Sequence, residues 1–419
     1  MATIGADRPG RIALALATAA ALAAGGCAHL ERGAVIAEVP PAAILPRVRV
    51  GLSVGAGTVT LGGGAALRLA LPDGTPVARL GAGSTATARL APEGILVQLG
   101  GATLPALEAA TLAPEDTGTV RLDGRDYRGV VDLVRTAEGL VAANHVTVEE
   151  YLAGVVNAEM GRRAPAELEA LRAQAVVSRT IAIRAIGRVP GRGYDLLATV
   201  ADQAYLGVQA EQPQGLEAVA ATRGIVLTWE GVPIDAFFHS TCGGQTAEPT
   251  EIFAYAGGRP YLRSVSDLRP DGSAYCAISP RYRWREEWQE PGLSATLRQT
   301  VPGGVPGRLR EVAVTARGRT GRVQAIAVRH GAGERTVTGA NLVRQVLRPA
   351  AGGMLRSSQF TLQGHQSGGD LARLVAEGSG AGHGVGMCQW GAVARSRDGS
   401  AWPEILAAYF PGAELARLY

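Results

Sequence analysis

The chain has 419 residues, which is long enough for two or three domains. Hydrophobic residues make up 47% and charged residues 19%, so globular cores are expected. The formal net charge is only +4, all 41 basic residues are arginines, and no basic run is clustered, so the composition gives little support to nucleic-acid binding.

The N-terminus has the pattern of an export signal. Arg8 and Arg11 precede an apolar run at residues 12–24 that is too short to span a membrane. The small residues that follow, up to Cys27, resemble a bacterial lipoprotein signal in which this cysteine is lipidated after cleavage. The alternative is an ordinary cleaved signal peptide with a chance cysteine. Both interpretations predict an exported protein. The lipoprotein signal also predicts a lipid anchor at the periplasmic face of an envelope membrane.

A linker and a β-rich region follow the signal. Residues 28–46 are small and contain proline, which is typical of a tether. Residues 47–143 show short apolar alternations separated by turn signals such as Pro72-Asp73-Gly74. We expect this region to be a β domain that supports or positions the catalytic part of the chain.

Residues 145–187 predict two helices joined by a short loop. Thr147 and Glu150 can form a capping box, in which each side chain satisfies a backbone N–H of the first turn. Apolar residues then recur at helical spacing as far as Met160. Pro165 is well placed in the first turn of the second helix, which is expected to run to the end of the segment.

Glu159 lies on the apolar face of the first predicted helix, four residues after Val155. Glu149 and Asn157 are predicted to point to the opposite side, towards solvent. A carboxylate on the face meant for burial breaks the local pattern, and such breaks tend to be functional. Desolvation there disfavours the charged form of Glu159, which suits a general acid.

Helices and strands alternate after residue 187. They are predicted at residues 213–222, 226–229, 234–238, 312–314, 325–328, from about 339, and at 402–410, and the segments 226–229 and 234–238 are expected to form a hairpin over Glu230-Gly231. Two polar, glycine-rich segments interrupt this pattern at residues 239–246 and 382–392. Glycines alternate with His383 in the second segment, which indicates backbone held close to packed structure or to a ligand.

Five motifs resemble the SpoIID/LytB family, in the family's order. They are EEYLAGVVNAEM (149–160), LEALRAQAVVSRT (168–180), HSTCGGQT (239–246), LRSSQF (355–360) and GHGVGMCQWGA (382–392). This family contains the sporulation protein SpoIID, a peptidoglycan lytic transglycosylase, and LytB, an enhancer of a cell-wall amidase. Sequence pattern and resemblance together predict an α+β fold, with the N-terminal β-rich domain followed by a mixed α/β SpoIID-like catalytic domain. This second domain is expected at residues 144–419, with a β-rich insertion near 280–365.

The resemblance implies a role for Glu159, which matches the catalytic acid of the SpoIID branch. A lytic transglycosylase can act with one carboxyl group, which protonates the glycosidic oxygen and then removes a proton from the muramic acid 6-hydroxyl. Arg179 matches a functionally important arginine, and with Gln174 it could orient that carboxylate or the sugar. Alternatively, Arg179 pairs with Glu159 in a structural ion pair that lowers the pKa of the carboxyl group.

Other residues of the matching motifs are expected to bind the substrate or to support the site. They are Tyr205, His239, Ser240, Thr241, His383 and Gln389. For His383, a buried hydrogen-bonded position is the alternative to a role in the cleft. The expected partner is the peptidoglycan glycan strand, with no cofactor and no nucleic acid. The alternative to an enzyme is a non-catalytic protein that binds the cell wall and stimulates an amidase.

Three cysteines remain if Cys27 carries lipid. In an oxidising compartment a disulfide between Cys242 and Cys276 is expected. The alternative is a closed tetrahedral zinc site built from His239, Cys242, Cys276 and Cys388. Because the disulfide is preferred, no metal site is predicted.

Overall fold

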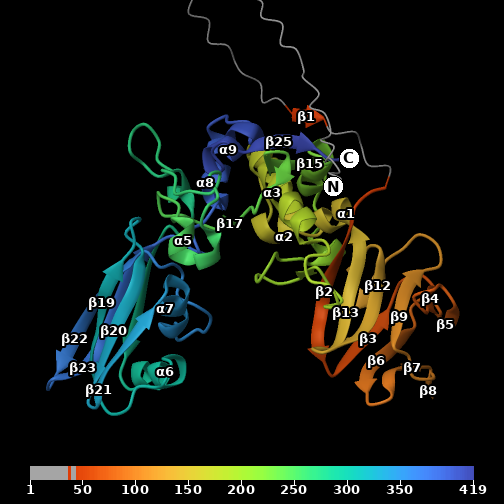
Figure 1. Cartoon of the computed structure of the whole chain (residues 1–419), viewed down its shortest axis with the longest axis horizontal. Helices are drawn as coiled ribbons and strands as arrows, with labels where there is room; N and C mark the ends of the chain where they lie inside the picture. The colour runs from red at the N-terminus through yellow and green to blue at the C-terminus, as the bar shows by residue number, and fades with distance from the viewer. Residues whose placement is uncertain (1–35, 39–43) are drawn as a thin grey trace, which may run out of the picture. The chain divides into compact units, whose positions relative to one another are not determined.

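The computed structural model of the chain describes residues 36–38 and 44–419 (Figure 1). The fold class is α+β, as predicted, with β-sheets at the N-terminal side and helices combined with sheets after them. The predicted signal segment, including Cys27, lies outside the described residues, as does most of the predicted linker. Within the described ranges, no helix combines the length and apolar character that crossing a membrane requires.

Two sheets are built mainly from residues 47–147. The larger sheet has the strand order β14 (Leu196–Leu197), β2 (Arg47–Ala56), β13 (Gly139–Thr147), β12 (Val130–Thr136), β9 (Ala109–Pro114), β4 (Leu67–Ala70) and β5 (Pro76–Leu80). The other has the order β11 (Arg125–Tyr127), β10 (Val120–Leu122), β3 (Thr58–Gly62), β6 (Thr85–Ala91), β7 (Gly94–Leu99) and β8 (Ala102–Thr103). In β2, buried Val48 and Val50 alternate with the less buried Arg47 and Arg49, the period expected of a strand with one face on a core.

The predicted helix pair follows β13 directly. It consists of α1 (Val148–Ala153), α2 (Val156–Met160), η1 (Pro165–Glu167) and α3 (Leu168–Ala185). The capping box is confirmed: the Thr147 hydroxyl accepts from the Glu150 N–H, and the Glu150 carboxylate accepts from the Thr147 N–H. Strand β13 pairs with β2 as far as Thr147, which lies opposite Arg47. Helix α1 begins at the next residue, Val148.

The first predicted helix is broken at Gly154, which the sequence pattern did not indicate. The Gly154 N–H donates to the Tyr151 carbonyl, three residues back, at 3.0 Å, and the Gly154 carbonyl accepts from the Leu206 N–H at 3.2 Å. The carbonyl therefore bonds outside the helix. The ring of Tyr205 packs so closely on this residue that a Cβ at position 154 would lie 2.5 Å from its Cε2 atom.

Replacing Gly154 with alanine is expected to lower the free energy of unfolding by about 1–3 kcal/mol, the usual cost of overpacking a core. The backbone itself tolerates alanine, because φ is −86° and ψ is −7°. Gly292→Ala is the matched control, since a Cβ there meets no atom within 4 Å and the residue lies in a helix. Urea unfolding measures both variants, and equal stability of Gly154→Ala and the wild type would contradict the packing argument.

Helix α3 is buried along most of its length by the C-terminal part of the chain. It contacts α4 (Pro213–Ala221), β15 (Ile225–Trp229), α8 (Gln389–Arg397) and α9 (Trp402–Tyr409). Strand β15 belongs to a sheet ordered β1 (Ile36–Glu38), β25 (Glu414–Arg417), β15 and β16 (Val232–Pro233). The predicted hairpin turn is present, with positive φ at Glu230 and Gly231. Short helices elsewhere are η2 (Gly207–Ala210), α5 (Pro249–Ile252), η3 (Ala254–Ala256) and η4 (Tyr275–Ile278).

Residues 283–379 form two three-stranded sheets with their own hydrophobic core. One is ordered β18 (Arg283–Gln289), β23 (Asp370–Ser379) and β22 (Phe360–Ser367), and the other β19 (Leu309–Arg317), β20 (Val323–His330) and β21 (Gly333–Thr338). Two helices, α6 (Gly292–Thr300) and α7 (Ala340–Val346), contribute Leu297 and Val343 to this core beside Ile326. This β-rich segment thus extends beyond the predicted boundary near residue 365.

A short parallel pair joins the two glycine-rich segments singled out in the sequence. Strand β17 (Phe238–His239) pairs with β24 (Met387–Cys388), which places His239 opposite Cys388. A further bridge connects Thr241 with Ala381. Residues 239–246 and 382–392, about 140 positions apart in sequence, therefore lie side by side.

Candidate functional site

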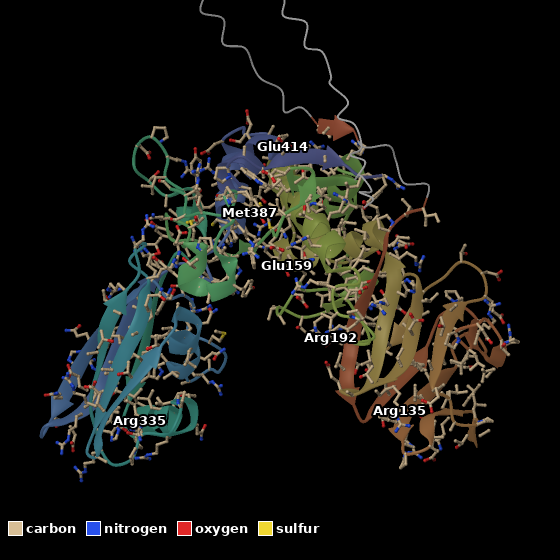
Figure 2. All side chains as sticks on the ribbon, viewed as in Figure 1. Arg135, Glu159, Arg192, Arg335, Met387 and Glu414 are labelled. Atoms are coloured by element: carbon tan, nitrogen blue, oxygen red, sulfur yellow. The ribbon has the colours of Figure 1, made fainter. Side chains whose placement is uncertain are left out.

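A cleft with a volume of about 970 Å³ lies beside Glu159. Its lining comes from the end of α2, the C-terminal half of α3, the segment around β17, and residues 381–390. Figure 2 shows Glu159 on α2 and Met387 on β24. The helix pair and the two glycine-rich segments thus meet around one cavity.

Glu159 is partly buried at the edge of this cleft. The Ala204 N–H donates a hydrogen bond to its Oε1 atom at 2.5 Å. Burial is the largest influence on this carboxyl group and raises its pKa, although the Ala204 N–H and the Gln389 side chain oppose the shift. The direction is the one expected from the position of Glu159 on an apolar helix face, and a raised pKa favours the proton-carrying form that a general acid needs.

Arg179 does not line the cleft. It is fully buried and forms a bidentate ion pair with Glu149, with Nε–Oε1 and Nη2–Oε2 distances of 2.7 and 2.8 Å. The alternative that Arg179 pairs with Glu159 is therefore wrong. Arg179 also donates to the Val219 and Ile225 carbonyls, so it ties α1 and α3 to the elements that follow.

The predicted solvent-facing positions of Glu149 and Asn157 are also wrong. The Glu149 carboxylate accepts from Tyr419 and from the Gly224 N–H in addition to Arg179. Asn157 is 7% exposed and donates to the Gly161 carbonyl. The reason is tertiary: α4 and the C-terminal residues cover the face of α1 and α2 that the helical pattern left polar.

Gln174, Tyr205 and Thr241 support the site from behind the cleft lining. Gln174 is fully buried and accepts from the Gln389 amide at 3.4 Å, so it holds a residue that does line the cleft. The Tyr205 hydroxyl donates to Asn144 at 2.7 Å within an aromatic cluster, and its ring lies in the core. The Thr241 and Ser279 hydroxyl oxygens are 2.8 Å apart and buried.

His239, Ser240, His383 and Gln389 line the cleft itself. His383 Nδ1 accepts from the Val385 N–H at 3.1 Å, and burial lowers the pKa of His383 to about 4. Burial also lowers the pKa of His239 well below its usual value, while its Nδ1 contacts the Val385 carbonyl at 3.1 Å. Both imidazoles are therefore neutral at pH 7. His383 is half-buried and hydrogen-bonded, and it also forms part of the cleft wall, so features of both alternatives are present.

The cleft also contains arginine and aromatic side chains that the sequence did not mark as candidate site residues. The arginines are Arg163, Arg184, Arg188, Arg192, Arg259 and Arg281. The guanidinium of Arg163 lies 4.6 Å from the ring centroid of Trp390, and Phe253 and Tyr255 provide further aromatic surface. Arg184, Arg188 and Arg192 recur every four residues, but α3 ends at Ala185, so helical spacing does not explain why all three line the cleft.

The expected disulfide is absent from the described structure. Cys242 and Cys276 are neighbours, but their sulfur atoms are 3.5 Å apart and both are free thiols, whereas a disulfide requires about 2.05 Å. Cys388 is a third free thiol in the same place. His239, a ligand in the alternative zinc site, is not in this cluster, and Asp267 takes its place.

Two families match parts of the chain. The SpoIID family, described as stage II sporulation protein, matches residues 136–229, which include Glu159 and Arg179. A domain of unknown function (DUF8618) matches residues 275–386 and so overlaps the β-rich segment with the separate core.

Individual proteins with sporulation and amidase-enhancer names are also similar to this chain. Stage II sporulation protein D of Bacillus amyloliquefaciens is 29% identical over 303 residues, which cover 68% of this chain and 78% of the relative. The protein of the same name from Bacillus subtilis (strain 168) is 27% identical over 301 residues, with the same coverage. The amidase enhancer of Bacillus subtilis (strain 168) is 26% identical over 343 residues, which cover 73% of this chain but only 46% of the relative. Residues 136–229 of the chain therefore match the SpoIID family, and the chain is similar to proteins named stage II sporulation protein D and amidase enhancer.

Proposed function

We propose that this chain is a cell-wall remodelling protein that cleaves peptidoglycan glycan strands by lytic transglycosylation, with Glu159 as its single acid and base. The observation that carries the proposal is a carboxyl group with a raised pKa at the edge of a cleft large enough for sugar residues. The similarity to stage II sporulation protein D supports a wall-related role.

Two other carboxylates of the cleft, Asp195 and Asp235, are less suited to donate a proton. Asp235 accepts from Arg184 and Arg259, and Asp195 accepts from Arg49. These hydrogen bonds outweigh burial and lower the pKa of both aspartates. Glu159 has no arginine partner among the residues that the structure describes. Of these three cleft carboxyl groups, Glu159 is thus the one best able to carry a proton.

The proposed reaction needs one carboxyl group and consumes no water. Glu159 donates its proton to the glycosidic oxygen as the bond from that oxygen to C1 of muramic acid breaks. The resulting carboxylate then accepts the proton of the 6-hydroxyl while this oxygen bonds to C1, which closes the anhydro ring and restores the acid. The neutral His239 and His383, with Gln389, can hydrogen-bond sugar hydroxyls without adding charge.

Muropeptide analysis tests the proposal. The mature chain is incubated with purified peptidoglycan, both with its amidated peptide stems and after the stems have been removed, and anhydro-muramyl products are expected. An unchanged profile with measurable glycan binding would overturn the enzyme proposal. Stimulation of an amidase in that case would support the second function, a non-catalytic enhancer, which the similarity to the amidase enhancer favours.

The proposed location is the cell envelope, with a lipid on Cys27. The full chain is expected to partition with membranes and to take up labelled fatty acid, because small residues precede Cys27 at the end of the apolar run. Cys27→Ser is expected to lose both properties while the rest of the chain stays folded. Equal membrane association and labelling of Cys27→Ser and the wild type would contradict the anchor.

A further inference from the structure

Three thiols and a carboxylate form a closed cluster outside the proposed catalytic site. The Sγ atoms of Cys242, Cys276 and Cys388 and an Asp267 carboxylate oxygen all lie within 4.8 Å of one another. All four residues are completely buried. From this arrangement we propose that the four side chains bind one Zn²⁺ ion in a structural, four-coordinate site.

The distances between the donor atoms suit a tetrahedral ion. With Zn–S bonds of about 2.3 Å, the sulfur atoms of a tetrahedral site are about 3.8 Å apart. The Cys242 and Cys276 sulfurs are separated by 3.5 Å, and the Cys242 sulfur is 3.2 Å from Asp267 Oδ2. Small shifts of the side chains would complete the coordination. A disulfide between Cys242 and Cys276 would instead leave the third thiol, Cys388, and the Oδ2 atom of Asp267 packed beside it.

Backbone N–H groups point at the sulfur atoms. The Gly244 N–H donates to the Cys242 sulfur at 3.3 Å. The Cys388 sulfur accepts from the Cys242 N–H at 3.2 Å and from the Gly391 N–H at 3.3 Å, so it caps the N-terminus of α8. Such donors and the positive end of a helix stabilise thiolates, the form in which cysteine binds a metal.

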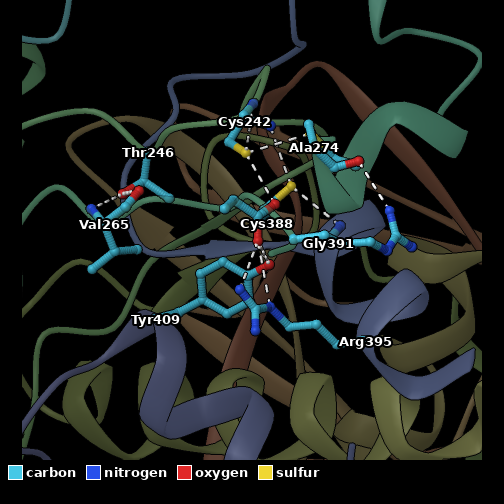
Figure 3. A network of polar contacts seen from close by, with 12 residues as sticks. Cys242, Thr246, Val265, Ala274, Cys388, Gly391, Arg395 and Tyr409 are labelled. Carbon is cyan, nitrogen blue, oxygen red and sulfur yellow. Dashed lines mark hydrogen bonds and ion pairs between the residues drawn. The ribbon is translucent and has the colours of Figure 1, made fainter. Parts of the chain in front are cut away.

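A second set of side chains holds Asp267 in place. Figure 3 shows Cys242 and Cys388 near Tyr409 and Arg395, with dashed lines marking the contacts among the residues drawn. The Tyr409 hydroxyl donates to Asp267 Oδ1 at 2.7 Å, and Arg395 donates to the same oxygen at 3.2 Å. These bonds leave Oδ2, on the sulfur side, free to bind the ion, and outer contacts of this kind orient metal ligands.

The local charges also fit the proposed ion. Three thiolates and one carboxylate around Zn²⁺ leave a net charge of −2, which Arg395 and Arg322 would offset. Arg322 is 1% exposed and donates only to the Cys242 and Gln245 carbonyls, both at 3.0 Å. It has no carboxylate partner among the described residues. Glu251 lies near enough to stabilise the charge of Arg322, and a negatively charged metal centre would add to the compensation that a buried cation needs.

The proposed site would stabilise one wall of the cleft. It joins the loop after β17, the segment before η4, η4 itself and the start of α8. Cys388 pairs with His239 and is followed directly by Gln389, and both of these neighbours line the cleft. All four zinc positions are taken by protein, so the ion would hold the wall together and would not activate water.

Metal analysis of the full chain tests the site. One zinc per chain is expected after purification without chelators, in the wild type and in the Cys27→Ser control alike. Cys242→Ser, Cys276→Ser and Cys388→Ser are each expected to lose the stoichiometric zinc. Absence of stoichiometric metal from the freshly purified wild type would overturn the proposal. A protein mass two hydrogens below that of the reduced chain, with two thiols that stay unreactive after unfolding, would also overturn it and would establish the disulfide.

Two measurements keep the proposal testable if the serine variants fail to fold. Titrating the wild type with a mercurial should release one zinc as three thiols react, and replacing zinc with Co²⁺ should give thiolate charge-transfer absorption with visible bands of tetrahedral intensity.

Tyr409→Phe removes only the hydroxyl that holds Asp267, so zinc affinity should fall by about 10–100-fold while saturating zinc still binds one to one. Unchanged affinity in this folded variant, or a cobalt spectrum without thiolate bands, would overturn the assignment.

Discussion

Glu159→Gln is expected to lower the rate of glycan cleavage by about 10²–10⁴-fold or more, the range that general acid–base catalysis contributes. Glutamine keeps the size and the hydrogen-bonding head of the side chain but has no proton to transfer. The amide can still meet the Ala204 N–H with its oxygen, so the site should keep its shape. The production of anhydro-muropeptides over time from purified peptidoglycan measures the loss.

Glu150→Gln is the matched control for this experiment. Glu150 lies on the neighbouring helix α1, outside the cleft lining, and glutamine can replace glutamate in a capping box. The control should therefore keep wild-type activity and nearly wild-type stability. If Glu159→Gln cleaves glycan as fast as the control, the proton donor lies elsewhere in the chain.

The stability of Glu159→Gln gives an independent check on the raised pKa. Because the pKa of Glu159 is higher in the folded than in the unfolded state, the folded state binds more protons between these two values. The free energy of unfolding therefore falls as the pH rises through the folded pKa, and above it the ionised carboxylate disfavours folding. Glutamine removes this cost, so the variant should be as stable as the wild type or slightly more stable at pH 7. The difference should shrink below the unfolded pKa, where the carboxyl group is protonated in both states.

Features with local causes were predictable from the sequence. The capping box at Thr147 follows from a four-residue pattern, and the turn at Glu230-Gly231 follows from two residues between apolar runs. Glu159 was also singled out by the sequence, because a carboxylate on the helix face meant for burial breaks the local pattern, and in the structure it lies beside the cleft.

Features that depend on distant segments were not predictable in the same way. The break at Gly154 lies where the Leu206 N–H bonds to its carbonyl and the ring of Tyr205, fifty-one residues later, packs against it, and nothing in the helical spacing marks it. Asp267 joins the three cysteines through a long loop, and no metal-ligand spacing leads to it. The helical pattern around Glu149 describes one helix alone, so it could not show that later parts of the chain cover that face.

Glu149→Gln is expected to lower the free energy of unfolding at pH 7 by about 3–5 kcal/mol, the cost of breaking a buried ion pair by removing one partner. Its side chain is only 12% exposed and its partner Arg179 is fully buried, so the variant leaves an uncompensated guanidinium inside the protein. The amide can satisfy part of the hydrogen bonding but none of the charge. Urea unfolding at pH 7 measures the effect.

Glu217→Gln is the matched control, because Glu217 also pairs with an arginine of α3 but its side chain is 53% exposed. Exposed ion pairs contribute about 0–1 kcal/mol, so this control should be close to the wild type. Equal stability of Glu149→Gln and Glu217→Gln would contradict the view that the buried pair stabilises the helix pair.

The pH dependence separates the charge of Glu149 from its packing. Burial opposes ionisation of Glu149, but the hydrogen bonds and charge of Arg179, with help from Tyr419, outweigh it and lower the pKa. The stability gained from this carboxylate is therefore fully present above its unfolded pKa and is lost as the pH falls through the folded one. The difference between wild type and Glu149→Gln should accordingly narrow in acid. The folded fraction of this variant should still cleave glycan, because Glu149 does not line the cleft and the substitution leaves Glu159 unchanged.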